Sequence, residues 1–473
     1  MDSATFHVLA STHQQAWAPM TRPDIVTPGS CPSRRSLPVF RPQDLRVSNS
    51  RRTSRHLQFV RCSMRTGVNS NSPRNKNPAV EVDPASKTRR LAGGPPPDRA
   101  TTSTSSRGLV LDLGPVDSWD CAEIGSPVVK RYIGDNEERW YMWYHGRSIS
   151  EEGTDRDLIG LATSSNGIHW SRGEGRVIRS CGDAGMVMEC RDNWWAFDTE
   201  SIRPSELVVM SSPMYSSVYW LYYTGYSSDE VDFRVESTSL PLSNPVRSLL
   251  GEERKILRSL PGLACSQDGR HWARIEGDHH SGALLDVGSG NEWDSLFIAG
   301  AQVVMHSSDD LRMYYHSFDR EKGRYAVGFA RSRDGIRWVK CGKITMGGGL
   351  SSSFDELGVK NARVVRNAGD GTYLMAYEAV AADGRTSIAM AASEDGLRNW
   401  RRLQEGPALE ASATDGWDNW AVGSPCLVPM EGQEDKWRMY YAGIGLGGRT
   451  GIGMAISEGS DARSFRRWSG ISL

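Results

Sequence analysis

Three glutamates lie in or beside short apolar segments of this 473-residue chain. A carboxylate in such a segment usually either pairs with a cation or serves a function. They are Glu123, Glu200 and Glu378. Two carboxylates that face one another can cleave a glycosidic bond, since one protonates the leaving oxygen while the other activates water or attacks directly. We therefore treat Glu123 and Glu200 as a candidate catalytic pair, with Glu378 as an alternative acid.

Cationic, imidazole and indole side chains occupy comparable positions and could bind a ligand. The candidates are His145, Arg147, Arg203, His316, Lys360, Trp119 and Trp420. Cations and imidazoles can bind sugar hydroxyls, and indole rings offer apolar faces to sugar C–H groups. Arg203, Lys360 and Arg363 could instead hold a phosphate or a carboxylate. Taken singly, a Glu on a strand is usually solvated or paired, and a lone His is more often structural than catalytic.

A unit that occurs five times must position these residues. Each copy begins with an aromatic residue and an Asp, followed by a short apolar stretch. The five Asp residues are Asp120, Asp198, Asp294, Asp355 and Asp418. An aromatic-rich segment comes next, such as RWYMWYHG (139–146), and then a segment of small and apolar residues, such as LIGLATS (158–164). An Asn-Gly or Asp-Gly turn and a Trp follow, and in the first copy Trp170 is expected to begin a fourth strand.

Aromatic and β-branched segments of this length, separated by Gly, Asn and Asp, are typical of β-strands. Each copy therefore predicts four short antiparallel strands, and four-stranded units repeated radially make a propeller. We predict an all-β, five-bladed β-propeller over residues 108–473. The expected blades cover about 117–179, 194–288, 292–348, 353–410 and 416–473.

Two departures from the repeat carry further expectations. The segment LDLGPVDSWD (111–120) resembles LDVGSGNEWD (285–294), the end of one unit and the start of the next. We therefore predict that residues 108–113 lie beside the last blade and close the ring; a free extension with a chance similarity is the alternative. Residues 227–261 lack the repeat pattern, and we expect them to form a surface loop over one face.

Recurrence separates structural residues from candidates for function. The Asp that follows an aromatic residue occurs in every unit, so we expect it to accept hydrogen bonds from backbone N–H groups where each blade begins. A residue that only one unit adds on an inner or second strand is a candidate for function.

The first 107 residues differ in composition from the rest. They hold 17 Lys and Arg against 6 Asp and Glu, which leaves 39 against 51 in the remainder. An Arg- and Ser-rich, acid-poor N-terminus is typical of an organelle transit peptide. We predict a plastid transit peptide over 1–62, a disordered linker over 63–107, and a chloroplast location. A plain disordered basic tail is the alternative.

Composition also limits the expected partners. No apolar run is long enough for a membrane span. The acidic globular part argues against nucleic acid, which proteins bind through Lys and Arg. No metal motif and no cofactor are expected. The expected partner is a carbohydrate or a small anionic ligand, bound by a monomer.

The repeated strands and S-x-D-G-x-x-W turns resemble those of the arabinanase/levansucrase/invertase superfamily, which includes glycoside hydrolase families 43 and 32. The resemblance covers essentially all of 109–473. It implies a five-bladed propeller with carboxylates on the inner strands of the first three blades. This chain has Ser126-Pro127, Arg203-Pro204 and Ala299-Gly300-Ala301 where those carboxylates are expected. None of the family's three acids is therefore carried over to this sequence.

Two hypotheses follow from these residues. In the first, the protein is a plastid glycoside hydrolase that uses Glu123 and Glu200, with Glu378 as an alternative acid. In the second, it is a non-catalytic propeller that binds a carbohydrate or an anionic ligand in its central funnel. Hydrolysis of aryl glycosides distinguishes the two hypotheses.

Overall fold

The structure is a computed structural model. It describes residues 106–133, 138–149, 156–178, 183–212, 215–233, 242–247, 255–344, 354–367, 369–430, 436–459 and 461–470. The predicted transit peptide and all but the last two residues of the predicted linker lie outside this described part. Within it, no helix is long and apolar enough to cross a membrane.

Twenty-one strands form five antiparallel sheets in the described part of the chain. The first blade contains β2 (Glu123–Ile133), β3 (Glu138–Arg147), β4 (Leu158–Ser164) and β5 (Gly185–Met188). The second contains β6 (Ser201–Ser212), β7 (Tyr215–Glu230), β8 (Leu257–Ser266) and β9 (Ala273–Ile275). The third contains β10 (Ala299–Ser307), β11 (Asp310–Asp319), β12 (Arg324–Ser332) and β13 (Val339–Ile344). The fourth contains β14 (Val359–Arg366), β15 (Tyr373–Val380), β16 (Thr386–Ser393) and β17 (Arg401–Arg402).

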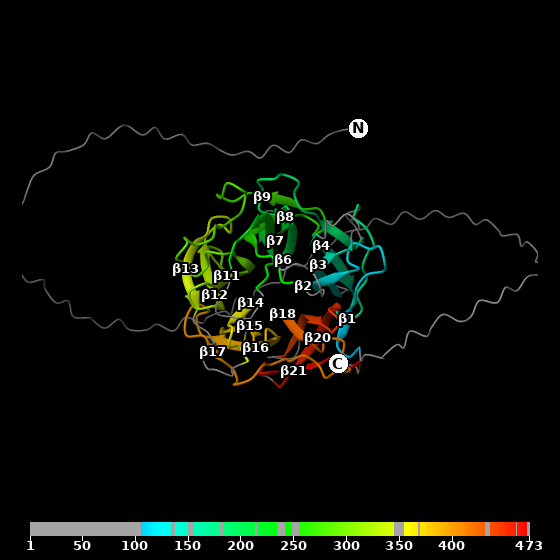
Figure 1. The fold of residues 1–473 in the computed structure, drawn as a ribbon. Helices are drawn as coiled ribbons and strands as arrows, with labels where there is room; N and C mark the ends of the chain where they lie inside the picture. The colour runs from blue at the N-terminus through cyan, green and yellow to red at the C-terminus, as the bar shows by residue number, and fades with distance from the viewer. Residues whose placement is uncertain are drawn as a thin grey trace, which may run out of the picture. The chain divides into compact units, whose positions relative to one another are not determined.

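The last blade has five strands because the chain ends and begins there. It contains β18 (Ala421–Pro429), β19 (Trp437–Ile444), β20 (Thr450–Glu458), β21 (Ser464–Arg467) and the N-terminal β1 (Leu109–Leu111). Both β1 and β21 pair with β20. The predicted closure of the ring by the N-terminal strand is confirmed. The five sheets surround a common axis, with β2, β6, β14 and β18 near the centre (Figure 1).

The first blade differs from the prediction in its outer strand. That strand is β5, whereas Trp170 was expected to begin it. Ser171 forms only an isolated bridge with Thr163. In the next three blades the outer strand does begin directly after the closing Trp, as at Trp338 and Val339.

The Asp residue of each unit is buried and structural, but its partners differ from those predicted. Asp120 accepts from the Tyr144 hydroxyl at 2.8 Å and from Arg172 at 2.9 Å. Asp418 likewise accepts from the hydroxyl of Tyr441. In the described residues these carboxylates bond to a second-strand Tyr or to a cation near the outer strand. They therefore link the strands of one blade, and the prediction of bonds from backbone N–H groups was wrong for Asp120, Asp198, Asp294 and Asp418, whose partners among the described residues are side chains.

The Asn-Gly and Asp-Gly turns form as predicted, and they also join neighbouring blades. In the third blade, the Ser332 Oγ accepts from the Gly335 N–H at 2.8 Å, and Gly335 has a φ of 76° that glycine adopts without strain. The Gly335 carbonyl accepts from the Tyr222 hydroxyl of the second blade at 3.1 Å. Tyr314 and Gly396 make the same contact at 2.6 Å.

The hydrophobic core is divided among the contacts between blades. One cluster packs Trp143 and Leu161 of the first blade against Leu207 and Leu221 of the second. Four more clusters join the remaining neighbouring pairs, including the last blade with the first. Since apolar side chains fill the spaces between the sheets, polar side chains on the inner strands are left to face the axis.

Candidate functional site

A cavity of about 110 Å³ lies at the axis and receives residues from all five blades. Its polar lining includes Glu123, Ser126, His145, Arg203, Thr224, His316, Lys360, Asn361, Arg363, Glu378 and Ser424. The insertion of the second blade adds Ser243, Asn244 and Val246. Its described segment therefore covers this face as predicted, although its flanks extend strands β7 and β8 instead of forming a loop.

Each inner strand carries a β-bulge beside this cavity. Four bulges hold a residue in the left-handed region: Ser126 (φ 48°), Gly300 (φ 62°), Asn361 (φ 47°) and Ser424 (φ 46°). A bulge bends its strand and redirects the side chains around it. The five bulges therefore turn the ends of the inner strands toward the cavity.

Glu123 is held by cations on the side of the first blade. Its carboxylate accepts from Arg147 at 2.7 Å and from Arg203 at 3.3 Å. The His145 Nε2 lies 3.6 Å from Glu123 Oε1, beyond hydrogen-bonding distance. Burial alone would raise the pKa of Glu123, but contact with His145 and the charge of Arg203 lower it to about 2. Glu123 is therefore ionised at neutral pH.

Asp157 is a second buried carboxylate in the same cluster, and it is not among the residues predicted from the sequence. It accepts from Arg203 Nε at 2.6 Å and pairs with Arg247 from the insertion. Burial opposes its ionisation, but the charges of Arg203 and Arg247 lower its pKa. Asp157 stands immediately before β4, where the corresponding residues of the third and fourth blades are Tyr325 and Thr386. A comparison of the third strands, like the one made for the first two, would have identified it.

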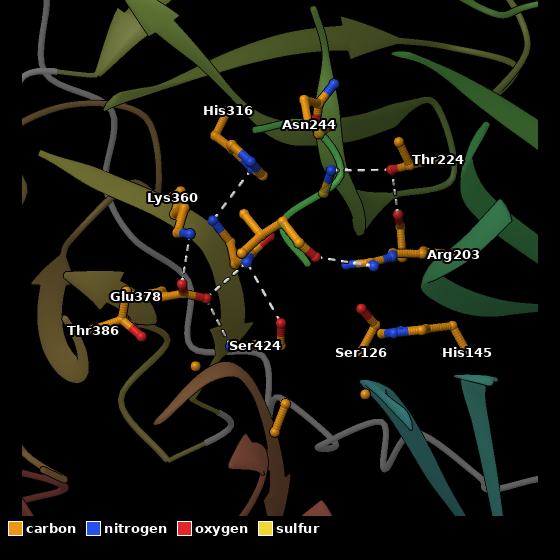
Figure 2. A pocket seen from close by; sticks show the side chains of 18 of the residues that line it. Ser126, His145, Arg203, Thr224, Asn244, His316, Lys360, Glu378, Thr386 and Ser424 are labelled. Carbon is orange, nitrogen blue, oxygen red and sulfur yellow. Dashed lines mark hydrogen bonds and ion pairs between the residues drawn. The ribbon is translucent and has the colours of Figure 1, made fainter. Parts of the chain in front are cut away.

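Lys360 and Glu378 form a buried ion pair on the opposite side of the cavity. Lys360 Nζ lies 2.9 Å from Glu378 Oε1. The other carboxylate oxygen of Glu378 accepts from the Asn361 amide at 2.8 Å and from the Ser424 N–H at 3.1 Å. Burial would raise the pKa of Glu378, but Lys360 and Asn361 lower it. These contacts are drawn in Figure 2.

His316 is a buried neutral base. Its Nδ1 accepts from the Asn361 N–H at 3.3 Å. Burial and the nearby charge of Lys360 lower the pKa of His316 to about 3. Its imidazole is therefore uncharged at neutral pH, and it acts here as a hydrogen-bond acceptor for backbone.

Arg363 differs from the other cations of the cavity. It is 7% exposed and forms no hydrogen bond or ion pair with another described residue. Against the effect of burial, its charge, after that of Lys130, helps to lower the pKa of Glu206, whose carboxylate is bound by Lys130 at 2.6 Å and by Gln302 at 2.8 Å. The guanidinium of Arg363 is thus available to an anion, since no described carboxylate occupies it.

Several predicted residues do not line the cavity. Glu200 is half-buried immediately before β6, outside the cavity lining. Trp119 is packed in the core between the last and first blades, and Trp420 is 46% exposed. Arg147 is buried behind Glu123. The structure does bring together Glu123, His145, Arg203, His316, Lys360 and Glu378.

The arrangement favours holding negative charge over donating a proton. A general acid needs a pKa near the working pH, and carboxylates acquire one through burial without a cationic partner. Both cavity glutamates have cationic partners and lowered pKa values. Within the described residues, no group of three His, Cys, Asp or Glu side chains is arranged to hold a metal ion.

Solved structures share this fold. No protein-family model matches the sequence, and a search of curated proteins found no match. A structure described as "Glycoside hydrolase" is 17% identical with a TM-score of 0.52, covering 78% of this chain and 96% of its own. An N-acetylgalactosamine deacetylase from F. plautii matches at 13% identity and a TM-score of 0.49, over 76% of this chain and 97% of its own. A thermostable family-43 glycoside hydrolase matches at 15% identity and a TM-score of 0.48, over 74% of this chain and 95% of its own.

The likeness at these identities is one of fold. The chain is a five-bladed propeller of the architecture found in solved glycoside hydrolases, as its repeats predicted. The activity has to be argued from the cavity itself, because one fold carries many functions.

Proposed function

We propose that this protein binds a carbohydrate carrying a negatively charged group, a carboxylate or a phosphate, in the axial cavity of its propeller. The observation that carries the proposal is the charge of the cavity. Arg203, Lys360 and Arg363 line it as cations, whereas Glu123 and Glu378 are its lining carboxylates. Both carboxylates are already neutralised by cations, so Arg363 is left for the ligand.

A buried guanidinium is well suited to such a ligand. It offers a planar fork of donors that binds carboxylate or phosphate through two parallel hydrogen bonds. Removal of water from the cavity strengthens this attraction relative to the same contact at the surface. The architecture shared with solved glycoside hydrolases supports a sugar as the body of the ligand, as an analogy of fold.

Calorimetric titration with D-glucuronate, D-glucose 6-phosphate and D-glucose tests the proposal. We expect at least one of the two charged sugars to bind, and neutral glucose to bind at least tenfold more weakly. Arg363→Met should remove this preference, and its melting temperature establishes that the variant is folded. Equal binding of glucose and both charged sugars, or binding of none of them, would overturn the proposal.

Hydrolysis of a glycoside is the second candidate, favoured by the presence of Glu123 and Glu378 on opposite sides of one cavity. Glu123 would then act as nucleophile or base. The difficulty is the proton donor, since neither carboxyl has a raised pKa. Turnover of aryl glycosides that is lost in Glu123→Gln would establish this alternative in place of binding alone.

The chloroplast location is proposed on composition. It rests on the Arg- and Ser-rich, acid-poor segment 1–62. A fluorescent protein fused after residue 62 should enter plastids, and a fusion that remains outside them would contradict the proposal.

A further inference from the structure

The second strand of each blade presents one side chain to the cavity, at the position opposite the start of the inner-strand bulge. In blade order these residues are His145, Thr224, His316, Glu378 and Ala442. Three of them accept a hydrogen bond from the bulge amide of the next blade. Since a bulge leaves its extra N–H outside the strand ladder, these side chains supply the missing acceptors.

The three bonds run in the same direction around the ring. The Gly300 N–H donates to Thr224 Oγ1 at 3.0 Å. The Asn361 N–H donates to His316 Nδ1 at 3.3 Å, and the Ser424 N–H donates to Glu378 Oε2 at 3.1 Å. His316 of the third blade and Glu378 of the fourth therefore each connect their blade to the next one in the propeller.

The corresponding hydrogen bond is absent at two contacts among the described residues, between the first and second blades and between the last and first blades. His145 should bond the bulge of the second blade, but Pro204 stands there and proline has no N–H. Proline also prevents the left-handed conformation that the other four bulges adopt. His145 is 3% exposed, and neither of its ring nitrogens has a hydrogen-bond partner.

The second interruption concerns Ser126, the bulge residue of the first blade. The residue that would accept from it is Ala442 of the last blade, which has no polar side-chain atom. The hydroxyl of Ser126 forms no hydrogen bond with another described side chain, and it lines the cavity. Ser126 and His145 belong to the same side of the cavity in Figure 2, away from Lys360 and Glu378.

The two groups also lie close in space, because Gly125 of β2 pairs with His145 of β3. A Cβ atom on Gly125 would lie only 2.8 Å from Cε1 of His145, so the imidazole lies against the backbone that leads into Ser126. A larger residue at position 125 would require the imidazole to move. The position therefore combines a hydroxyl without a side-chain hydrogen bond and a buried imidazole whose closest charged neighbour, Glu123, is 3.6 Å from Nε2, too far for a hydrogen bond.

We propose that His145 and Ser126 form a hydroxyl-recognition subsite, which binds a pair of neighbouring hydroxyl groups on the ligand. The inference rests on the proposed function, because it assigns the neutral part of the charged sugar to the first blade and its anion to Arg363. A neutral imidazole has one donor and one acceptor, and a hydroxyl has both. Sugar hydroxyls therefore satisfy both residues, whereas an anion would satisfy only donors.

The physical reason for such a subsite is the cost of leaving buried polar groups unpaired. A buried donor or acceptor without a partner has lost its hydrogen bonds to water, and a ligand recovers that cost by making the bond. A site built to bond a hydroxyl also rejects analogues that lack it, because the protein groups are then left unpaired. His145 and Ser126 thus select a ligand by its hydroxyl groups, while Arg363 selects it by its negative charge.

The test compares two probes that separate these roles, D-glucuronate and inorganic phosphate, in calorimetric titrations. In His145→Phe we expect D-glucuronate to bind at least tenfold more weakly and phosphate to bind as in the unaltered protein. Ser126→Gly removes the hydroxyl and tolerates the positive φ, and it should act in the same direction with a smaller loss. Arg363→Met should weaken both probes. His169→Phe, at an exposed histidine, is the matched control.

A second variant tests the cause of the interruption. Pro204→Gly returns an amide donor and a residue that can adopt positive φ, so it should give His145 a partner inside the protein. We expect weaker binding of D-glucuronate with unchanged binding of phosphate. Pro429→Gly, at an exposed proline at the end of β18, controls for the loss of proline.

The outcomes separate the two proposals. If D-glucuronate binds as tightly to His145→Phe as to the unaltered protein, or if both probes weaken alike, the hydroxyl-recognition subsite is wrong and the charged-sugar proposal stands. If no charged sugar binds the unaltered protein, the charged-sugar proposal fails and the subsite fails with it. Melting temperatures of all variants establish that each is folded.

Discussion

The two sides of the axial cavity use the same positions of the repeat in opposite ways. On the fourth blade, Glu378 bonds Lys360, Asn361 and the Ser424 amide, so its hydrogen bonds are made within the protein. On the first blade, the equivalent residue is His145, which has no hydrogen-bond partner. Glu378 is satisfied within the protein, whereas the two ring nitrogens of His145 make no hydrogen bond.

The difference shows that a residue unique to one unit is not thereby functional. Glu378 and His316 depart from the repeat, yet both hold bulge amides of neighbouring blades. His145 departs from it in the same way but lacks such a bond because the next bulge contains Pro204. A unique residue becomes a candidate for ligand binding only when the structure leaves its polar atoms without partners.

The largest expected effect on stability follows from removing the charge of Asp157, the buried carboxylate between the first and second blades. Asp157→Asn leaves Arg203 and Arg247 without their shared partner, and removing one member of a buried ion pair costs about 3–5 kcal/mol. We expect a loss of this size in the free energy of unfolding, measured by urea denaturation. Asp383→Asn, in an exposed pair with Arg385, should cost less than about 1 kcal/mol. Equal effects of the two substitutions would contradict the importance of the buried cluster.

Acid should destabilise the fold through His316 before the carboxylates are protonated. Its pKa is about 3 in the folded protein against an ordinary value of 6.5, because burial and Lys360 disfavour the charged form. The unfolded chain therefore binds the proton more readily, so stability is complete above pH 6.5 and falls as the pH is lowered toward 3. The slope for one proton is about 1.4 kcal/mol per pH unit. Glu123 adds to the loss only below its ordinary pKa of 4.5.

The measurement is the melting temperature between pH 8 and pH 4. In His316→Gln, which keeps an acceptor for the Asn361 N–H, the decline between pH 6.5 and 4.5 should be shallower than in the unaltered protein. An unchanged slope would mean that another group controls this range.

The smallest expected effect on stability comes from a comparison of Thr224, which accepts a hydrogen bond from the next blade, with His145, which does not. Thr224→Val leaves the Gly300 N–H without its acceptor and should cost about 1–3 kcal/mol. His145→Phe removes two nitrogens that have no partner, so it should cost less and is compatible with a gain. Thermal denaturation of the two variants checks the order, and a larger loss in His145→Phe would show that the imidazole is bonded inside the protein.

Much of the fold could be predicted because each repeat is a local pattern. The Ser-x-Asp-Gly turns, the aromatic second strands and the similarity between 111–120 and 285–294 together predicted the blades and the closure of the ring. The outer strand of the first blade was missed, since nothing in residues 171–188 repeats elsewhere. Among the site candidates, Glu200, Trp119 and Trp420 lie outside the cavity lining because a position near an inner strand does not specify the direction of its side chain.

The sequence by itself determined a five-bladed ring, because strand period, turn chemistry and recurrence are properties of short stretches of chain. Only the tertiary structure decided the site. Asp157, Arg203 and Arg247 come from different parts of the chain and meet because the first and second blades pack side by side. Whether a polar side chain has a hydrogen-bond partner depends on the residue that the neighbouring blade places opposite it. Pro204 is that residue for His145, and it offers no N–H. Such contacts between blades exist only once the propeller has formed.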